Sequence, residues 1–505
     1  MDSETVVDPD SLDRRLYQNV GLLFGPIIFI LMMLFSDHQD VMSIIAWRVA
    51  AVGLLMAIWW ATEALPVAVT ALVPLVTFDI LEISSMKEAA APYANPTIYL
   101  FLGAFILAIA VQRWNLHKRI AFFILSKTGT DGRRLIGGFM LVAALLSMWM
   151  TNTSTTMMLL PIALSVISVI LIQMQNLPDI SQQNFQISML LGLAFAATIG
   201  GMSTLIGTPP NALFAAYMEE TFDISISFFD WMMVGVPLAS IMLILAWSVL
   251  TIVVYPSDIK ESAEVRQHLL SESVALGKLT TPEKRVALTF ALVILFWVVR
   301  RPLTAALDLS GLSDASIALT GALLLFILPS GEREQSKLLV WDDLKGLPWG
   351  VLILFGGGLS LASAISNSGL ASWLGQSLSP LSFMGVGFVV FCATALVIFL
   401  TEMTSNLATT ATFLPILGAL ALQIGISPVV LCVPVTLAAS CAFMLPVATP
   451  PNAVVFSSGF ITIPQMIRAG LYLNILGLGL LIVISYWLAP LIFLTLVISL
   501  KKYSF

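Results

Sequence analysis

Long apolar runs separated by short polar segments follow one another along almost the whole chain. A run of about twenty apolar residues is long enough to cross the hydrocarbon core of a bilayer as a helix. The pattern predicts eleven such spans, near residues 20–36, 43–62, 65–82, 97–112, 187–218, 232–255, 286–301, 315–329, 349–367, 428–458 and 469–497. The sequence therefore indicates an all-α protein that crosses a lipid bilayer many times.

Two further apolar pairs, at about 135–174 and 382–424, are each interrupted by a short polar motif around an asparagine. The motifs read TNTSTT from Thr151 and SNLATT from Ser405. Non-helical backbone is tolerated at membrane depth only where protein or water satisfies its polar groups. We therefore predict two re-entrant hairpins, each of which enters and leaves the membrane on the same side.

The two motifs belong to a long internal repeat. Asn152 and Asn406 lie 254 residues apart (406 minus 152). The same offset relates Phe101 to Phe355, Gly103 to Gly357 and Pro161 to Pro415. A second motif, TPPN, follows each copy, at Thr208 and at Thr449. Because an odd number of predicted crossings separates equivalent spans, the two copies are expected to face opposite sides of the membrane. Paired interruptions in an inverted repeat are typical of the binding site of a secondary transporter.

The repeat predicts a division of the chain into five parts. Residues 1–96 are expected to form an N-terminal tail and scaffold helices, and residues 285–348 further scaffold helices. The first repeat, 97–255, holds an inward hairpin and a broken helix at 208–212, and the second repeat, 349–505, holds an outward hairpin and a broken helix at 449–453. The longest polar interval, 256–284, is expected to be a cytoplasmic connector.

Composition supports a membrane protein and excludes several other classes. Hydrophobic residues make up 58% of the 505 residues and charged residues only 10%, a balance foreign to water-soluble domains. The net charge of −6 argues against a nucleic-acid partner, which requires a concentrated basic surface. Most of the 23 Lys and Arg residues fall on cytoplasmic segments if the N-terminus is cytoplasmic. Since no targeting segment is evident, we expect a bacterial inner membrane.

The motifs offer uncharged oxygens and helix N-termini where an enzyme would offer acids, bases or metal ligands. An Asn that breaks a helix can cap the following helix and turn its carbonyl oxygen toward a cation. In TPPN, Thr is a candidate N-cap and the first Pro suits position N1. Four helix N-termini, each with about half a positive charge and several free N–H groups, would together suit a dianion. The hard oxygens would suit a small cation such as Na⁺.

Glu402, four residues before Asn406, is an ionisable residue inside a predicted hairpin. An intramembrane carboxylate marks a functional site by default, so Glu402 is a candidate cation-linked or proton-linked group. The interpretation that we prefer is that its carboxylate holds the hairpin through hydrogen bonds to the backbone.

Taken together, these motifs resemble the divalent anion/sodium symporter family over nearly the whole chain. Thr151-Asn152-Thr153 and Ser405-Asn406-Leu407 are similar to its two Ser-Asn-Thr signatures. The resemblance implies one sodium site at Ser147, Thr151, Asn152 and the backbone of Gly200, and a second at Thr401, Thr404, Asn406 and the backbone of Ala448. It implies substrate contacts at Asn152, Thr153, Gly201, Asn406, Leu407, Thr449 and Pro450, with Thr208 and Pro209 close by.

The resemblance further implies sodium-coupled symport of a C4-dicarboxylate such as succinate, malate or fumarate. Transport would follow an elevator mechanism, in which a transport domain slides against a scaffold, and the protein would form a homodimer. Leu407 replaces a Thr of the family pattern and Gly201 offers no hydroxyl, so the substrate stays open. Symport of citrate or sulfate and sodium-independent dicarboxylate exchange are the alternatives. An anion channel fits two occluding hairpins less well, and no catalytic residues are expected.

Overall fold

The computed structural model describes residues 16–173, 179–257, 259–309, 311–332, 337–378, 383 and 385–502. The described part of the chain is mostly helical, and its one isolated β-bridge pairs Pro329 with Lys337. Ten helical segments among these residues are long and apolar enough to span a membrane. The chain is therefore an all-α, multi-pass membrane protein, as its sequence pattern predicted.

The helices fall into an N-terminal group, two repeats and a middle group. The N-terminal group is α1 (Leu16–Leu34), α2 (Ile44–Thr62), α3 (Val67–Thr70), α4 (Val73–Thr77) and α5 (Met86–Ala90). The first repeat is α6 (Pro96–Arg113), α7 (Leu116–Leu125), α8 (Gly132–Ser147), α9 (Asn152–Gln173), α10 (Asp179–Gly201), α11 (Pro209–Phe222) and α12 (Phe228–Ser248).

The middle group comprises α13 (Ala263–Ala275), α14 (Thr281–Leu307) and α15 (Asp314–Ile327). The second repeat is α16 (Trp349–Asn367), α17 (Leu370–Leu378), α18 (Val386–Thr401), α19 (Asn406–Gln423), α20 (Pro428–Ala438), α21 (Pro450–Phe456) and α22 (Ile463–Lys502). Helix α13 lies in the interval expected to be a connector and packs against α7 and α9.

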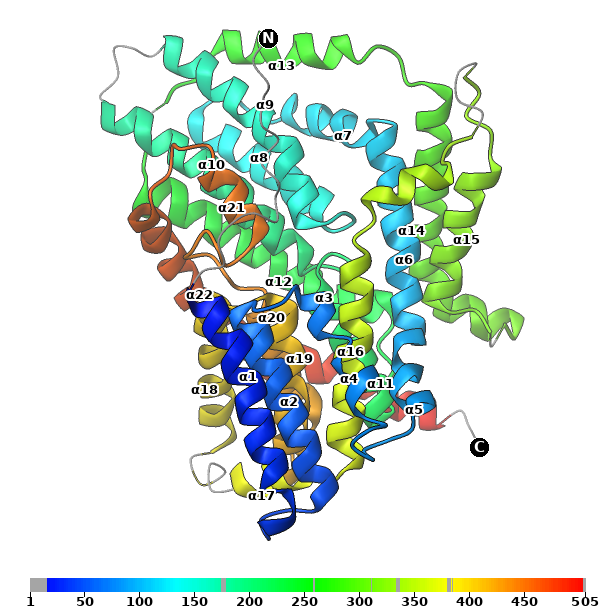
Figure 1. The fold of residues 1–505 in the computed structure, drawn as a ribbon. Helices are drawn as coiled ribbons and strands as arrows, with labels where there is room; N and C mark the ends of the chain where they lie inside the picture. The colour runs from blue at the N-terminus through cyan, green and yellow to red at the C-terminus, as the bar shows by residue number, and fades with distance from the viewer. Residues whose placement is uncertain are drawn as a thin grey trace, which may run out of the picture.

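Both repeats present the same order of helices in opposite directions. Helices α8 and α18 have 16 residues each and begin 254 residues apart (386 minus 132). In Figure 1, α6 runs toward the end of the molecule that carries α7 and α13, whereas α16 runs toward the opposite end, where α17 lies. The α8–α9 and α18–α19 hairpins occupy opposite halves of the molecule (Figure 1). The repeat is therefore inverted, as expected.

A contact between equivalent residues marks the region where the two repeats meet. The rings of Phe101 and Phe355 are 5.0 Å apart, centroid to centroid. Residues related by a two-fold operation touch each other only close to the axis, so the pseudo-two-fold axis passes near these rings. Two residues further on, Gly103 lies against the α15 backbone, and a Cβ there would come within 2.7 Å of Ala318. Helix α6 of the first repeat therefore packs closely against α15 of the middle group.

The structure divides three of the expected spans into shorter helices. The span expected at 65–82 is two short helices, α3 and α4, because Pro74 lies in the first turn of α4 and cannot continue a helix from α3. The spans expected at 187–218 and 428–458 are each two helices, α10 with α11 and α20 with α21. The non-helical segments lie at 202–208, called the first break, and at 439–449, called the second break. Both precede the TPPN prolines and so lie mostly before the expected positions, 208–212 and 449–453.

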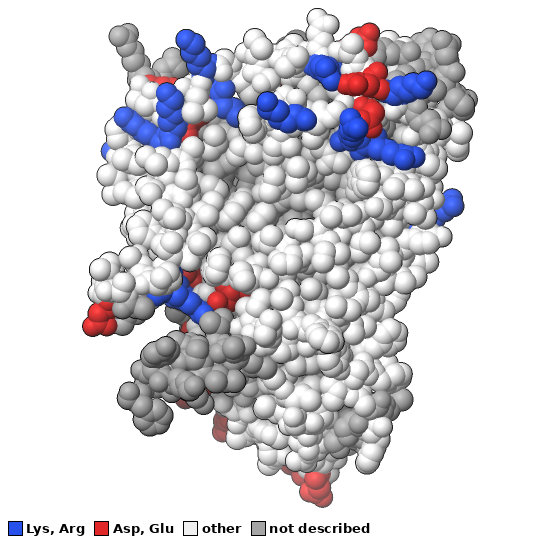
Figure 2. Space-filling model, turned by 180° about the vertical axis from the view of Figure 1, so that it is seen from behind, with Lys and Arg blue, Asp and Glu red and all other residues white. Residues whose placement is uncertain are grey.

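Basic residues are unevenly distributed over the surface. Figure 2 shows Lys and Arg side chains gathered around the end of the molecule that carries α7 and α13 in Figure 1, with a broad uncharged band beside them. Two arginines near the end of α14 lie away from this basic end, but both are paired with carboxylates. Arg300 is 2.7 Å from Asp314, and Arg301 pairs with Asp230. The distribution matches a protein with one positively charged membrane face.

Candidate functional site

The tip of the first hairpin brings together oxygen atoms from three helices and a break. The side-chain amide of Asn152 has one terminal atom 2.6 Å from Ser147 Oγ and 3.2 Å from the carbonyl oxygens of Ala197 and Gly207. We call these four residues the first oxygen cluster. Either the amide nitrogen occupies this position and its two hydrogens are donated among the three neighbouring oxygens, or the amide oxygen occupies it and a cation lies among four oxygens. The donor set is of the kind that Na⁺ prefers.

The second hairpin repeats this arrangement with different residues. Thr401 Oγ1 lies 3.0 Å from Asn406 Oδ1 and 2.8 Å from the carbonyl oxygen of Ala439. We call these three residues the second oxygen cluster. A hydroxyl has one hydrogen, so Thr401 cannot donate fully to both acceptors. The surplus of acceptor oxygens makes this cluster a second fitting environment for a small cation.

Free backbone N–H groups lie beside both clusters, at the first turns of α9 and α19. At α9, the Ser154 N–H donates to Thr151 Oγ1 (3.3 Å), while the N–H groups of Asn152 and Thr153 have no acceptor in the described part of the chain. At α19, Ser405 forms no side-chain cap, and the first three N–H groups lack acceptors among the described residues. Free N–H groups at a helix N-terminus form a site for a carboxylate or another anion.

The two TPPN motifs differ from their expected role as anion sites. Thr208 and Thr449 occupy the N-cap positions of α11 and α21 as predicted, but neither side chain makes a cap hydrogen bond. Both following residues in each motif are proline and have no N–H, so the expectation of several free N–H groups at these helices was wrong. Among these four helix N-termini, only the first turns of α9 and α19 carry two or more free N–H groups in the described part of the chain.

The asparagine of each TPPN motif instead holds the break that precedes it. Asn211 Nδ2 donates to the carbonyl oxygens of Gly201 (3.2 Å) and Thr204 (2.7 Å). Asn452 Nδ2, 241 residues later (452 minus 211), donates to the carbonyl oxygens of Ala442 and Leu445, both at 3.1 Å. The two acceptors of each asparagine are equivalent at the same offset. The asparagine of each TPPN motif therefore fixes the backbone of the preceding break, in the same way in both repeats.

The broken helices cross over between the repeats. Helix α11 of the first repeat packs against α19 of the second hairpin, and α21 of the second repeat packs against α9 of the first hairpin. The rings of Phe195 on α10 and Phe443 in the second break are 5.2 Å apart. Each hairpin therefore packs against a broken helix from the other repeat.

The predicted substrate residues lie in this region with different exposures. Gly201 is buried, and a Cβ there would come within 2.6 Å of Asn152 Oδ1, so the position has room only for glycine. Leu407 is 4% exposed and packs in the apolar core, which leaves its backbone N–H as the group near the site. Thr153 is half-buried, Thr449 is buried and Pro450 is exposed.

Several predicted sodium ligands have other partners in the structure. Thr151 Oγ1 contacts Ser154 Oγ at 3.0 Å, and Thr404 Oγ1 contacts Thr409 Oγ1 at 2.6 Å. The carbonyl oxygen of Gly200 accepts the N–H of Ser203. The remaining predicted ligand, Ala448, donates its N–H to Leu445 O in the turn before α21. The structure thus brings Ser147 to Asn152 and Thr401 to Asn406.

Three oxygens of the clusters were missed by sequence reasoning. They are the carbonyl oxygens of Ala197, Gly207 and Ala439. Every residue carries a carbonyl group, so residue type holds no signal for such a ligand. Only Gly207 adjoins a predicted helix break, at 208–212, where carbonyl groups lose their helical partners. Ala197 and Ala439 lie outside both predicted breaks, so nothing in the sequence indicated their role.

Glu402 holds the second break, as the preferred interpretation predicted. The residue is 3% exposed, and its carboxylate accepts hydrogen bonds from the backbone N–H groups of Phe443, Met444 and Leu445 and from Asn474 Nδ2. These donors surround both carboxylate oxygens. Glu402 therefore acts on the backbone of the break.

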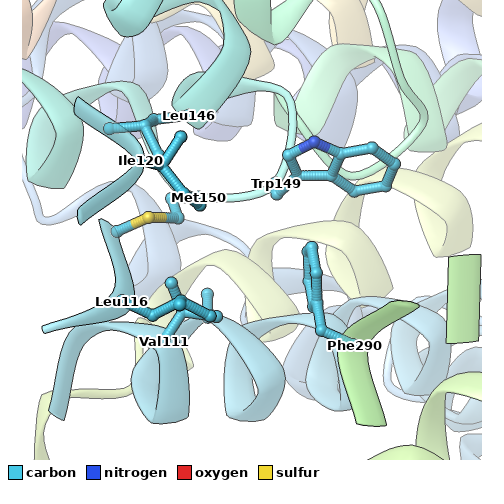
Figure 3. A pocket seen from close by; sticks show the side chains of 8 residues that line it. Val111, Leu116, Ile120, Leu146, Trp149, Met150 and Phe290 are labelled. Atoms are coloured by element: carbon cyan, nitrogen blue, oxygen red, sulfur yellow. The ribbon is translucent and has the colours of Figure 1, made fainter. Parts of the chain in front are cut away.

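A small crevice beside the first hairpin tip has a different character. Figure 3 shows it lined by apolar side chains of α6, α7, α14 and the hairpin tip, including Val111, Met150 and Phe290. Trp149 at the tip stacks on Phe228 and Trp297, with ring centroids 6.0 Å and 6.5 Å away. The crevice presents no polar group to a dianion, so it is a packing region between the tip and α14.

Comparison with known proteins extends over nearly the whole chain. Residues 18–494 match the sequence model of a family described as the sodium:sulfate symporter transmembrane region. The chain is 40% identical over 477 residues to the sodium-dependent dicarboxylate transporter SdcS of Staphylococcus saprophyticus, covering 94% of this chain and 92% of that protein. It is also 40% identical, over 481 residues with the same coverage, to SdcS of Staphylococcus aureus.

No cluster of His, Cys, Asp or Glu able to hold a metal ion occurs among the described residues.

Proposed function

This chain belongs to the sodium:sulfate symporter family, and from that premise we propose that it is a sodium-coupled carrier of C4-dicarboxylates such as succinate, malate or fumarate. Two similar proteins that it matches over 94% of its length are named sodium-dependent dicarboxylate transporters. The observation that carries the proposal is the pairing of an oxygen cluster with free helix N–H groups at each hairpin tip. The protein is a transporter and has no enzymatic role in this proposal.

Sodium would bind at the two oxygen clusters. The first offers Ser147 and Asn152 with two carbonyl oxygens, and the second offers Thr401 and Asn406 with one. The ligands are neutral, so each bound sodium ion leaves a full positive charge close to the adjacent helix N-terminus. That charge favours a carboxylate there and explains why sodium and a dianion would move together. No Lys or Arg occurs in residues 147–156 or 401–410, so only the weaker attraction of the helix N–H groups remains when sodium leaves.

The substrate would place one carboxylate at the first turn of α9 and the other at the first turn of α19. The N–H groups of Thr153 and Leu407 belong to these turns. Gly201 provides no hydroxyl and the Leu407 side chain is buried, so these two positions add no side-chain donor for a third carboxylate. A dicarboxylate is therefore favoured over citrate. A compact tetrahedral sulfate would reach two separate N-termini less well than a four-carbon chain.

Alternating access would follow from the inverted repeat. We assign the hairpins, the broken helices, α12 and α22 to a transport domain that moves as an elevator. Scaffold helices from 1–96 and 285–348, with α6 and α16, would stay in place and form the homodimer contact, while 256–284 connects the repeats. The basic end of the molecule would face the cytoplasm with the N-terminus, in a bacterial inner membrane (Figure 2).

The test is uptake of radiolabelled succinate into proteoliposomes of the purified protein. An inward sodium gradient is expected to drive accumulation, and a matched potassium gradient is expected to drive none. Uptake that ignores sodium but requires internal dicarboxylate would replace symport by exchange. Sodium-driven uptake of labelled citrate or sulfate, with none of succinate, would keep the coupling and refute the C4 assignment.

A further inference from the structure

The second break contains an anion site that is filled by the protein itself. Glu402 Oε1 accepts the N–H groups of Phe443 (2.8 Å) and Met444 (3.0 Å), and Oε2 accepts those of Met444 (2.9 Å) and Leu445 (3.1 Å). Consecutive backbone N–H groups that point to one place form a concavity that binds anions. Three backbone N–H groups, of which that of Met444 is shared between both carboxylate oxygens, thus fix the break against the residue that follows Thr401.

The same carboxylate connects the break to α22. Asn474 Nδ2 on α22 donates to Glu402 Oε1 at 2.7 Å, and both side chains are buried. One helical turn earlier, Gly470 lies against the break, where a Cβ would come within 2.4 Å of the carbonyl oxygen of Phe443. Helix α22 therefore contacts the break at two points, one polar and one steric.

The first repeat has no counterpart of this carboxylate. The residue equivalent to Glu402 is Met148 (402 minus 254), and its backbone carbonyl accepts the hydroxyl of Thr204 at 2.6 Å. In the first break, the N–H groups of Met202 and Ser203 bond to backbone carbonyls of α10. Neutral groups hold the first break, whereas a carboxylate holds the second.

We propose that Glu402 is the positioning residue of the second oxygen cluster and sets its affinity for sodium, an inference that rests on the proposed function. The break begins at Ala439, whose carbonyl oxygen belongs to that cluster, and Glu402 directly follows Thr401 of the same cluster. The clamp therefore fixes the two sides of the cluster relative to each other. Its oxygens are saturated by N–H donors, so Glu402 acts through the break and does not touch sodium.

Glu402→Gln tests this inference, because it keeps the size of the side chain and puts an NH₂ group where the backbone presents N–H donors. Loss of an outer-shell partner of this kind lowers metal affinity by about 10- to 100-fold. We expect the sodium concentration for half-maximal succinate uptake to rise by that factor, with the maximal rate retained at saturating sodium. Glu82→Gln, at an exposed carboxylate paired with Arg48, is the matched control and should leave sodium dependence unchanged.

A second readout needs no transport. Purified wild type, Glu402→Gln and Asn474→Leu are heated in detergent with increasing NaCl, at constant ionic strength set with KCl, and the sodium concentration for half-maximal stabilisation is measured. Asn474→Leu keeps the carboxylate and removes one of its bonds, so a smaller rise is expected, and this variant decides the matter if Glu402→Gln does not fold. Sodium dependence equal to wild type in the folded variants overturns the inference. A wild type that neither takes up succinate with sodium nor gains stability from sodium overturns the proposed function as well.

Discussion

Replacing Gly201 by alanine should displace Asn152 from the first oxygen cluster. A Cβ at this position would lie 2.6 Å from Asn152 Oδ1 and 3.0 Å from the carbonyl oxygen of Gly207, which belong to the cluster. Ordinary contact begins at 3.4 Å, so the amide must retreat by about 0.8 Å (3.4 minus 2.6). Binding constellations tolerate errors of about 0.5 Å. The displacement therefore exceeds what the cluster can accept.

The effect of this substitution on sodium binding can be measured separately from its effect on folding. Overpacking costs about 1–3 kcal/mol, and replacing a helical Gly by Ala returns up to about 1 kcal/mol, so the net cost to folding is at most about 3 kcal/mol. Disturbing a partner of a metal site costs about 10- to 100-fold in affinity. We expect Gly201→Ala to fold and to need at least tenfold more sodium for half-maximal uptake.

The assay is sodium-dependent succinate uptake in proteoliposomes, with thermal unfolding of the same preparations. Gly479→Ala is the matched control, because a Cβ there would meet no atom within 4 Å. Equal sodium dependence of the two variants would refute the reasoning, since it would mean that Asn152 does not help to bind sodium. If Gly201→Ala lowers the melting temperature but leaves the sodium response normal, the contact between position 201 and Asn152 contributes to packing and not to sodium binding.

Three further predictions concern the hairpins. Asn152→Ala and Asn406→Ala should each abolish uptake while the protein stays folded in detergent, as checked by size-exclusion chromatography; sodium-driven uptake by both would contradict the site. Leu407→Thr should leave the ranking of succinate, citrate and sulfate in competition assays unchanged. It should lower the free energy of unfolding by about 1–3 kcal/mol, because it buries a hydroxyl in the core. A new ranking of substrates would mean that the side chain at position 407 contacts the substrate. Trp149→Leu should lower the melting temperature, since each lost aromatic pair with Phe228 or Trp297 contributes about 0.5–1.5 kcal/mol. An unchanged melting temperature would mean that the stacking of Trp149 on these rings does not stabilise the protein.

The order of helices and the duplication were predictable because they depend on local patterns. Apolar run length predicts a membrane span, and an Asn flanked by hydroxyls predicts an interruption, without knowledge of distant residues. One error was avoidable from sequence, since the second proline of TPPN already removes a donor that the anion argument had counted. The error at 65–82 has the same origin, because Pro74 was visible inside the apolar run.

The sequence by itself determined the membrane class, the inverted repeat and the asparagines at both hairpin tips. Only the tertiary structure decided which carbonyl oxygens join them, because backbone groups of Ala197 or Ala439 are chemically the same as those of any other residue. Tertiary packing also decided that each broken helix packs against the opposite hairpin and that Leu407 is buried. The physical reason is that a binding site of this kind depends on distances between segments more than two hundred residues apart, and these distances are set by the packing of whole helices.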